Sequence, residues 1–150
     1  MNKINFLRLL TLLMLILSMQ ACKKDVEKWS DIPSISFESI SPSAMQEYSE
    51  PVIIKIKYQD GDGDLGQNNT DISNTFVTDL RNQTVYSFRT RQLAPNDAKV
   101  SITGNLEIEI PTTWILNNSN QESVQYSVYL VDRAGHTSNT ITTLSVQLSK

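Results

Sequence analysis

The fold is decided by the stretch Val52-Ile53-Ile54-Lys55-Ile56-Lys57-Tyr58-Gln59-Asp60-Gly61-Asp62-Gly63-Asp64-Leu65-Gly66. Its first half has apolar residues at every second position, which is typical of a β-strand with one buried face. Its second half alternates aspartate with glycine. The stretch therefore predicts a half-buried strand that runs directly into an acidic loop.

The same period of two recurs along most of the chain, and helical periodicity is weak. A single turn of helix is the most that we expect at Asn96–Lys99 and Thr112–Leu116. We predict about seven strands, at 34–39, 51–59, 74–80, 84–91, 102–110, 123–132 and 137–148. Such a series of short strands predicts an all-β fold, a single immunoglobulin-like or fibronectin-III-like β-sandwich over residues 34–150, although another Greek-key order fits equally well.

Two local features refine this prediction. Arg81-Asn82-Gln83 separates two strand-like segments and predicts a hairpin. In the last segment the alternation changes phase between Ile141 and Leu144, which predicts a bulge or bend.

The first 21 residues have the proportions of a signal peptide. Lys3 and Arg8 precede the apolar run Leu9–Leu17, which is too short for a stable membrane-spanning helix. The only cysteine, Cys22, follows the small residue Ala21, where such a segment is cleaved. We therefore predict that residues 1–21 are removed, that Cys22 is lipidated, and that residues 22–33 form a flexible tether.

This N-terminus resembles a bacterial lipoprotein signal with its lipobox, through Ala21-Cys22. The sequence Cys22-Lys23-Lys24-Asp25 is similar to the start of mature lipoproteins of the Bacteroidota. The resemblance implies a lipid anchor in the outer membrane. It also implies a slight preference for surface exposure over the periplasm, because acidic residues such as Asp25 and Glu27 soon follow the cysteine.

The charge of the mature chain excludes one class of partner. Two of the 13 basic residues lie in residues 1–21, which leaves 11 basic and 16 acidic residues and a net charge of −5. A domain this acidic is not expected to bind nucleic acid.

The aspartate–glycine loop has the ligand spacing of a calcium site. Carboxylates crowded in one loop repel each other, and a divalent cation reverses the sign of that energy. Counted against the twelve-residue calcium template, positions 1, 3, 5, 7, 9 and 12 are Asp60, Asp62, Asp64, Gly66, Asn68 and Asp71. Leu65 at position 6 and the absence of flanking helices exclude an EF-hand. We predict a Ca²⁺ site of another kind; a solvated acidic turn is the alternative.

A second loop is predicted to lie beside the first. In a seven-strand sandwich, the loops after the second and sixth strands lie at the same end. Asp132 continues the inward side of the sixth strand, so we expect it to approach the aspartate loop as a ligand or through a water, or else to cap a turn. If the strand persists to Arg133, this side chain points the other way, and His136 is expected to be a surface histidine.

These two loops also resemble those of a family. Tyr58–Gly66 followed by Asp132–Thr140 is similar to a group of small, largely uncharacterised Bacteroidota lipoproteins, with His136 where the family usually has asparagine. The similarity covers roughly residues 50–148. It implies an anchored β-sandwich and no particular activity.

The sequence predicts a binding role in preference to catalysis. No serine or cysteine nucleophile accompanies the only histidine, so we expect no enzyme but an interaction or accessory module on the outer membrane. Its partner would be another outer-membrane protein or a glycan. The alternative function is a carbohydrate-binding module that uses Trp114 and tyrosines as a platform, although such a tryptophan more often covers the edge of a sandwich.

Overall fold

The computed structural model describes residues 29–150 and contains only β-strands as regular structure. The strands in this part of the chain are β1 (Ser34–Ser41), β2 (Ala44–Gln46), β3 (Val52–Asp60), β4 (Thr75–Asp79), β5 (Thr84–Phe88), β6 (Ile102–Ile110), β7 (Gln121–Val124), β8 (Tyr126–Leu130), β9 (Ile141–Thr142) and β10 (Val146–Ser149). The all-β prediction is confirmed, and the helical turns expected at 96–99 and 112–116 are absent. Among the described residues there is no helix that could span a membrane.

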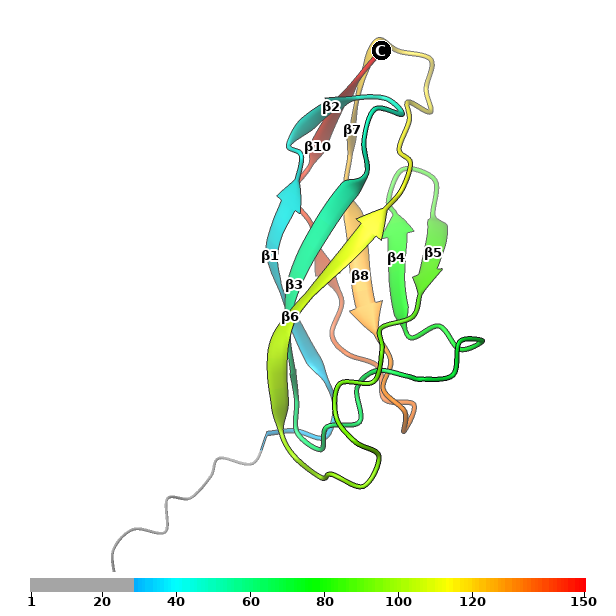
Figure 1. Cartoon of the computed structure of the whole chain (residues 1–150). Coiled ribbons are helices and arrows are strands. Elements are labelled where there is room, and N and C mark those ends of the chain that lie inside the picture. The colour runs from blue at the N-terminus through cyan, green and yellow to red at the C-terminus, as the bar shows by residue number, and fades with distance from the viewer. Residues whose placement is uncertain (1–28) are drawn as a thin grey trace, which may run out of the picture.

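Two sheets form the body of a β-sandwich (Figure 1). One sheet has the order β1-β3-β6 and the other the order β5-β4-β8-β9. Their inward residues share one core, in which Ile54 and Ile56 of the first sheet and Val77 and Val128 of the second are fully buried. Burial of these aliphatic side chains supplies most of the favourable folding energy.

A third, small sheet closes the end of the molecule that carries the C-terminus (Figure 1). It has the order β2-β10-β7, and β2 runs parallel to β10. The predicted strand 123–132 is therefore two strands, separated at Gln125, that belong to different sheets. The predicted strand 137–148 is likewise divided into β9 and β10.

The second division occurs where the alternation changes phase. Thr143 is buried, and its hydroxyl oxygen accepts a hydrogen bond from the Tyr126 amide at 3.1 Å. The Thr143 amide still donates to the Tyr126 carbonyl at 2.9 Å, but the Thr143 hydroxyl replaces a backbone carbonyl as the acceptor for the Tyr126 amide. Strand β9 ends just before this point, and the chain crosses to the small sheet. The predicted bend is confirmed.

The predicted hairpin is also confirmed. Strands β4 and β5 pair antiparallel, with Asp79 opposite Thr84 at the turn. Gln83 has a φ of 62° and donates its amide to the Asp79 carbonyl at 2.8 Å, which closes the loop.

The described chain begins beside the aspartate loop. The Gly61 amide donates to the Ser30 carbonyl at 2.9 Å, and Pro33 is buried. Ser30 and Pro33 belong to the predicted tether, residues 22–33, and yet they lie against the domain. The predicted signal peptide and the lipidated Cys22 lie outside the described residues.

Candidate metal centre

Asp60 ends strand β3 on its inward side. The four preceding inward residues are buried and apolar, and Asp60 continues their phase with 0% of its surface exposed. A carboxylate in such surroundings needs compensation. Its Oδ2 accepts a hydrogen bond from the Leu65 amide at 3.0 Å, and the Leu65 side chain is itself 1% exposed. Leu65 therefore anchors the loop in the core, which explains an apolar residue at this position.

Three aspartates of this loop converge on one point. One oxygen from each of Asp60, Asp62 and Asp64 lies within 4.8 Å of the other two. At that separation and an effective dielectric constant of about 20, each ionised pair repels by about 3.5 kcal/mol. The Oδ1 atoms of all three are buried and have no hydrogen-bond partner. Buried carboxylate oxygens without a partner are the ligands that a cation requires.

Burial and mutual repulsion change the acidity of this cluster. The pKa of Asp64 is raised to about 6, first by burial and then by the charges of Asp132, Asp62 and Asp60. Burial is also the main cause that raises the pKa of Asp60. Because both pKa values are raised, full ionisation of the metal-free loop is unfavourable. A bound cation would lower the pKa values again and favour the ionised carboxylates.

Glycine is required where the loop turns. Gly63 has a φ of 76°, a left-handed conformation that costs other residues about 1–2 kcal/mol. A Cβ at this position would also lie only 2.5 Å from the carbonyl oxygen of Val100. The spacing of aspartates by glycines thus has a steric reason in addition to a chemical one.

The loop after β8 is hydrogen-bonded to the aspartate loop. The predicted topology had placed these two loops at the same end of the sandwich. The Ala134 amide donates to Asp64 Oδ2 at 3.0 Å, and the Arg133 amide donates to the Asp64 carbonyl at 3.3 Å. The Arg133 guanidinium donates to the carbonyls of Gly66, at 2.9 Å, and Gly63, at 3.4 Å. Arg133 would point away only if the strand persisted; β8 ends at Leu130, before this residue, so its side chain is free to turn toward the aspartate loop.

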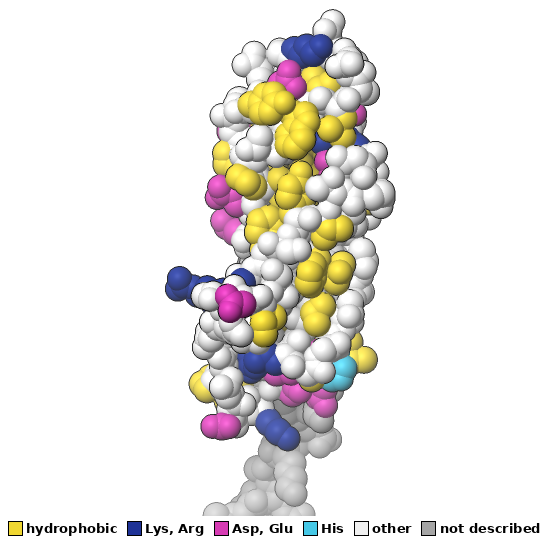
Figure 2. Space-filling model, turned by 90° about the vertical axis from the view of Figure 1, so that its right-hand side faces the viewer, with side chains coloured by type: hydrophobic (Ala, Val, Ile, Leu, Met, Phe, Trp, Pro, Cys, Tyr) yellow, Lys and Arg dark blue, Asp and Glu magenta, His cyan; other side chains and the backbone are white. Residues whose placement is uncertain are grey.

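Asp132 lies next to the cluster but makes its hydrogen bonds elsewhere. It is 7% exposed; its Oδ1 accepts from the His136 amide at 2.7 Å and its Oδ2 lies 2.9 Å from His136 Nδ1. The hydrogen bond with Asp132 raises the pKa of His136. Among the described residues, the group of converging ligand atoms contains Asp60, Asp62 and Asp64 and does not include Asp132. Figure 2 shows the histidine beside acidic side chains at the lower end of the molecule.

The other residues of the twelve-residue template lie outside this cluster. The carbonyl of Gly66, predicted at position 7, accepts the Arg133 guanidinium. Asn68 is exposed and donates its amide to Gln92 at 2.6 Å. Asp71 is exposed and is not part of the converging group. The chain leaves the cluster after the buried Leu65, so the loop does not wrap around a single centre as the template requires.

Trp114 lies at the opposite end of the sandwich, near β2. Its ring is parallel to that of Tyr48, with an interplanar angle of 3° and 6.1 Å between the centroids. Tyr48 is 63% exposed and has a φ of 62°, an uncommon conformation for a bulky residue. Tyrosines beside Trp114 were predicted, but Tyr48 was not singled out, because nothing in its local sequence indicates contact with a residue so far along the chain.

Comparisons with protein-family models, curated proteins and solved structures find no match. The functional argument therefore depends on the residues themselves. What they offer chemically is a cluster of oxygen ligands for a hard cation, held between two loops.

Proposed function

We propose that this chain is a calcium-stabilised β-sandwich lipoprotein, anchored in the outer membrane through Cys22, that acts as a non-enzymatic interaction or accessory module. The side chains of Asp60, Asp62 and Asp64 carry the metal part of the proposal: one oxygen of each converges within 4.8 Å of the others, and the buried Oδ1 atom of each has no hydrogen-bond partner. An unpaired buried carboxylate is costly, and a divalent cation compensates three of them at once.

The chemistry of the cluster supports calcium. All its ligand atoms are hard oxygens, which suit Ca²⁺ or Mg²⁺ better than zinc or copper. Two ligands of one ion lie at most twice the metal–oxygen distance apart, which is about 4.6–5.2 Å for calcium and about 4.2 Å for magnesium. A separation of up to 4.8 Å suits calcium without rearrangement.

The position of the cluster supports a structural role for the ion. Its loop contacts the beginning of the described chain through Gly61 and Ser30, and the loop after β8 through Asp64 and Ala134. An ion that neutralises the three aspartates would keep the aspartate loop in place, and with it the start of the described chain and the loop after β8, at the end of the domain next to the tether. The ion would then act as a clamp that makes this end rigid.

Calorimetric titration of the chelator-treated chain with CaCl₂ tests the metal site. We expect one ion per chain and a Kd on the order of 10⁻⁴–10⁻³ M, the range of extracellular calcium modules. Asp60→Asn should abolish the heat of binding, whereas Asp71→Asn, which alters an exposed aspartate outside the cluster, should leave it unchanged. Absence of any binding heat at millimolar Ca²⁺ would reject calcium as the cofactor.

The anchor requires a separate test, because Cys22 lies outside the described residues. When the full chain is expressed in a bacterium that processes lipoproteins, we expect it in the outer-membrane fraction and expect Cys22→Ser to move it to the soluble fraction. An unchanged membrane association in Cys22→Ser would contradict lipid anchoring. A pull-down from membranes with the anchored protein, with and without chelator, would then identify a calcium-dependent partner.

The stack of Tyr48 on Trp114 favours a second candidate, a carbohydrate-binding module. The Tyr48 ring is 63% exposed and is held parallel to Trp114, so it offers a flat apolar surface of the kind on which sugar rings stack. Arg81 bonds to the backbone carbonyl of Trp114 at 2.8 Å, so Trp114→Ala removes the indole and keeps that contact. Binding on a glycan array that is lost in Trp114→Ala and kept in Tyr129→Ala would support this function. No binding by the wild type would reject it.

A further inference from the structure

The guanidinium of Arg133 gathers backbone carbonyls of the aspartate loop. It donates to the carbonyls of Gly66, Gly63 and Leu65 at 2.9, 3.4 and 3.5 Å. An arginine carries five N–H donors in one plane, so a single guanidinium can hold several carbonyls. In the twelve-residue calcium template, the carbonyl at position 7, here that of Gly66, faces the metal ion instead. Arg133 therefore has a place that the ion has in the template.

The same guanidinium leaves the neighbouring carboxylates open. The ion pairs found among residues 29–150 include none between Arg133 and Asp60, Asp62 or Asp64. The Oδ1 atoms of these three aspartates also have no hydrogen-bond partner. Pairing with a carboxylate is the strongest contact that an arginine can make, so its orientation toward carbonyls is informative. Arg133 holds the backbone of the loop and leaves the three carboxylate oxygens to another cation.

The metal-free loop needs such a restraint. One oxygen from each aspartate lies within 4.8 Å of the other two, and ionised carboxylates at this separation repel each other. This repulsion favours an opened loop. Opposing it, the amides of Arg133 and Ala134 donate to the carbonyl and the Oδ2 of Asp64, at 3.3 and 3.0 Å. The guanidinium adds its contacts on both sides of Asp64, at Gly63 and Gly66.

We propose that Arg133 is a positioning residue that holds the metal-free loop in its calcium-binding conformation. This inference rests on the proposed calcium site and concerns how that site is formed. Because the loop is already closed when the ion arrives, little calcium affinity is lost to ordering it. The positive charge of the guanidinium acts in the opposite direction, since it repels the ion. The two effects differ in sign, so substitution of Arg133 separates them.

Calorimetric titration of two variants with CaCl₂ measures the effect on affinity, at a temperature where circular dichroism shows each variant to be folded. Arg133→Met removes both the charge and the contacts, and we expect its Kd to rise about tenfold. Loss of the charge alone would lower the Kd. Arg133→Lys keeps the charge but has no planar fork, so its Kd should rise by a smaller factor, about threefold.

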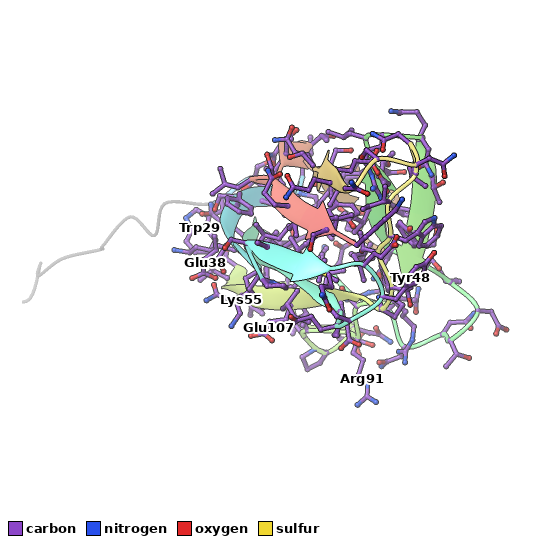
Figure 3. The ribbon with its side chains drawn as sticks, turned by 90° about the horizontal axis from the view of Figure 1, so that it is seen from above. Trp29, Glu38, Tyr48, Lys55, Arg91 and Glu107 are labelled. Atoms are coloured by element: carbon purple, nitrogen blue, oxygen red, sulfur yellow. The ribbon has the colours of Figure 1, made fainter. Side chains whose placement is uncertain are left out.

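Two other arginines provide matched controls. Arg89 donates to the Gln67 carbonyl at 3.0 Å, a contact of the same kind with a part of the chain that has left the cluster. Arg91 is exposed, and its side chain extends away from the domain, as Figure 3 shows. Arg89→Met and Arg91→Met each remove one positive charge and should leave the Kd for calcium nearly unchanged.

Hydrogen exchange in chelator tests the positioning without any ion. The Leu65 amide donates to Asp60 Oδ2 at 3.0 Å and therefore reports whether the loop is closed. We expect Arg133→Met to raise the exchange rate of this amide about tenfold, and Arg89→Met to leave it unchanged.

Three results would overturn the proposal. These are an unchanged exchange rate at Leu65 in Arg133→Met, calcium binding by this variant that is as tight as in the wild type or tighter, and equal effects of Arg133→Met and Arg89→Met. A wild type that binds no calcium would reject the proposed function. The exchange rates in chelator would then decide by themselves whether Arg133 holds the loop.

Discussion

Replacing Asp62 with asparagine should stabilise the metal-free protein and abolish its response to calcium. In the metal-free state Asp62 takes part in two repulsive pairs, with Asp60 and with Asp64, each worth about 3.5 kcal/mol when fully ionised. Partial protonation of Asp64, whose pKa is about 6, and the partial exposure of the Asp62 side chain to solvent reduce this energy. We therefore expect a gain of about 2 kcal/mol in the free energy of unfolding in chelator.

In calcium, the wild type should become more stable than Asp62→Asn, the reverse of their order in chelator. With a Kd of about 10⁻⁴ M, 10 mM Ca²⁺ stabilises the wild type by about 2.7 kcal/mol, because only the folded state binds the ion. For a domain of this size that energy raises Tm by about 10 °C. Asp62→Asn lacks one of the three ligands, so its Tm should be nearly the same with calcium and with chelator.

Thermal unfolding followed by circular dichroism in chelator, CaCl₂ and MgCl₂ measures both effects. Asp71→Asn is the matched control, since it removes an exposed carboxylate outside the cluster and should respond to calcium as the wild type does. The reasoning is refuted if Asp62→Asn lowers Tm in chelator, because the carboxylates would then not be repelling each other. It is also refuted if wild-type Tm does not depend on calcium.

Three further predictions concern pH, a buried ion network and the loop glycines. The folded-state pKa of Asp64 is raised to about 6, so its contribution to the stability of the metal-free protein is present at pH 4 and lost as pH rises through 6. In calcium, stability should instead rise with pH over this range, because the ion requires ionised ligands. Denaturant titrations from pH 4 to 8, with chelator and with calcium, measure both dependences of the free energy of unfolding on pH. Arg81 pairs with the buried carboxylate of Asp79 at 2.6 Å and with the partly buried carboxylate of Glu122 at 3.0 Å, so Arg81→Met should lower the free energy of unfolding by about 3 kcal/mol in urea denaturation, and a loss below 1 kcal/mol would contradict this. Gly63→Ala should lower the Tm of the domain more than Gly135→Ala does. Both glycines have positive φ, but an added Cβ would meet a backbone oxygen at Gly63 and open space at Gly135. Equal Tm values for the two variants would contradict this steric explanation.

Alternation was sufficient to predict most of the strands, because it reports directly which side chains face the core. It did not predict that the sixth and seventh strands each divide between two sheets. The division at Gln125 depends on long-range partners, since its carbonyl accepts the Leu80 amide and its side chain donates to the Thr143 carbonyl. Strand β2 was missed because three residues are too few to show a period.

The candidate site was predicted in part for similar reasons. Asp60, Asp62 and Asp64 are neighbours in sequence, and their spacing alone placed them together. The template positions beyond Leu65 assumed that the loop continues around the same centre, but burial of that side chain turns the chain away. The guanidinium of Arg133 among the loop carbonyls could not be foreseen, since it depends on where β8 ends.

The central claim is that a calcium ion binds where the three buried carboxylate oxygens converge. Crystals grown in CaCl₂, with anomalous diffraction data collected on them, test this most directly. We expect an anomalous peak about 2.3–2.6 Å from one carboxylate oxygen of each of Asp60, Asp62 and Asp64. A map with no peak there, in which those oxygens instead make hydrogen bonds to water or to each other, would contradict it.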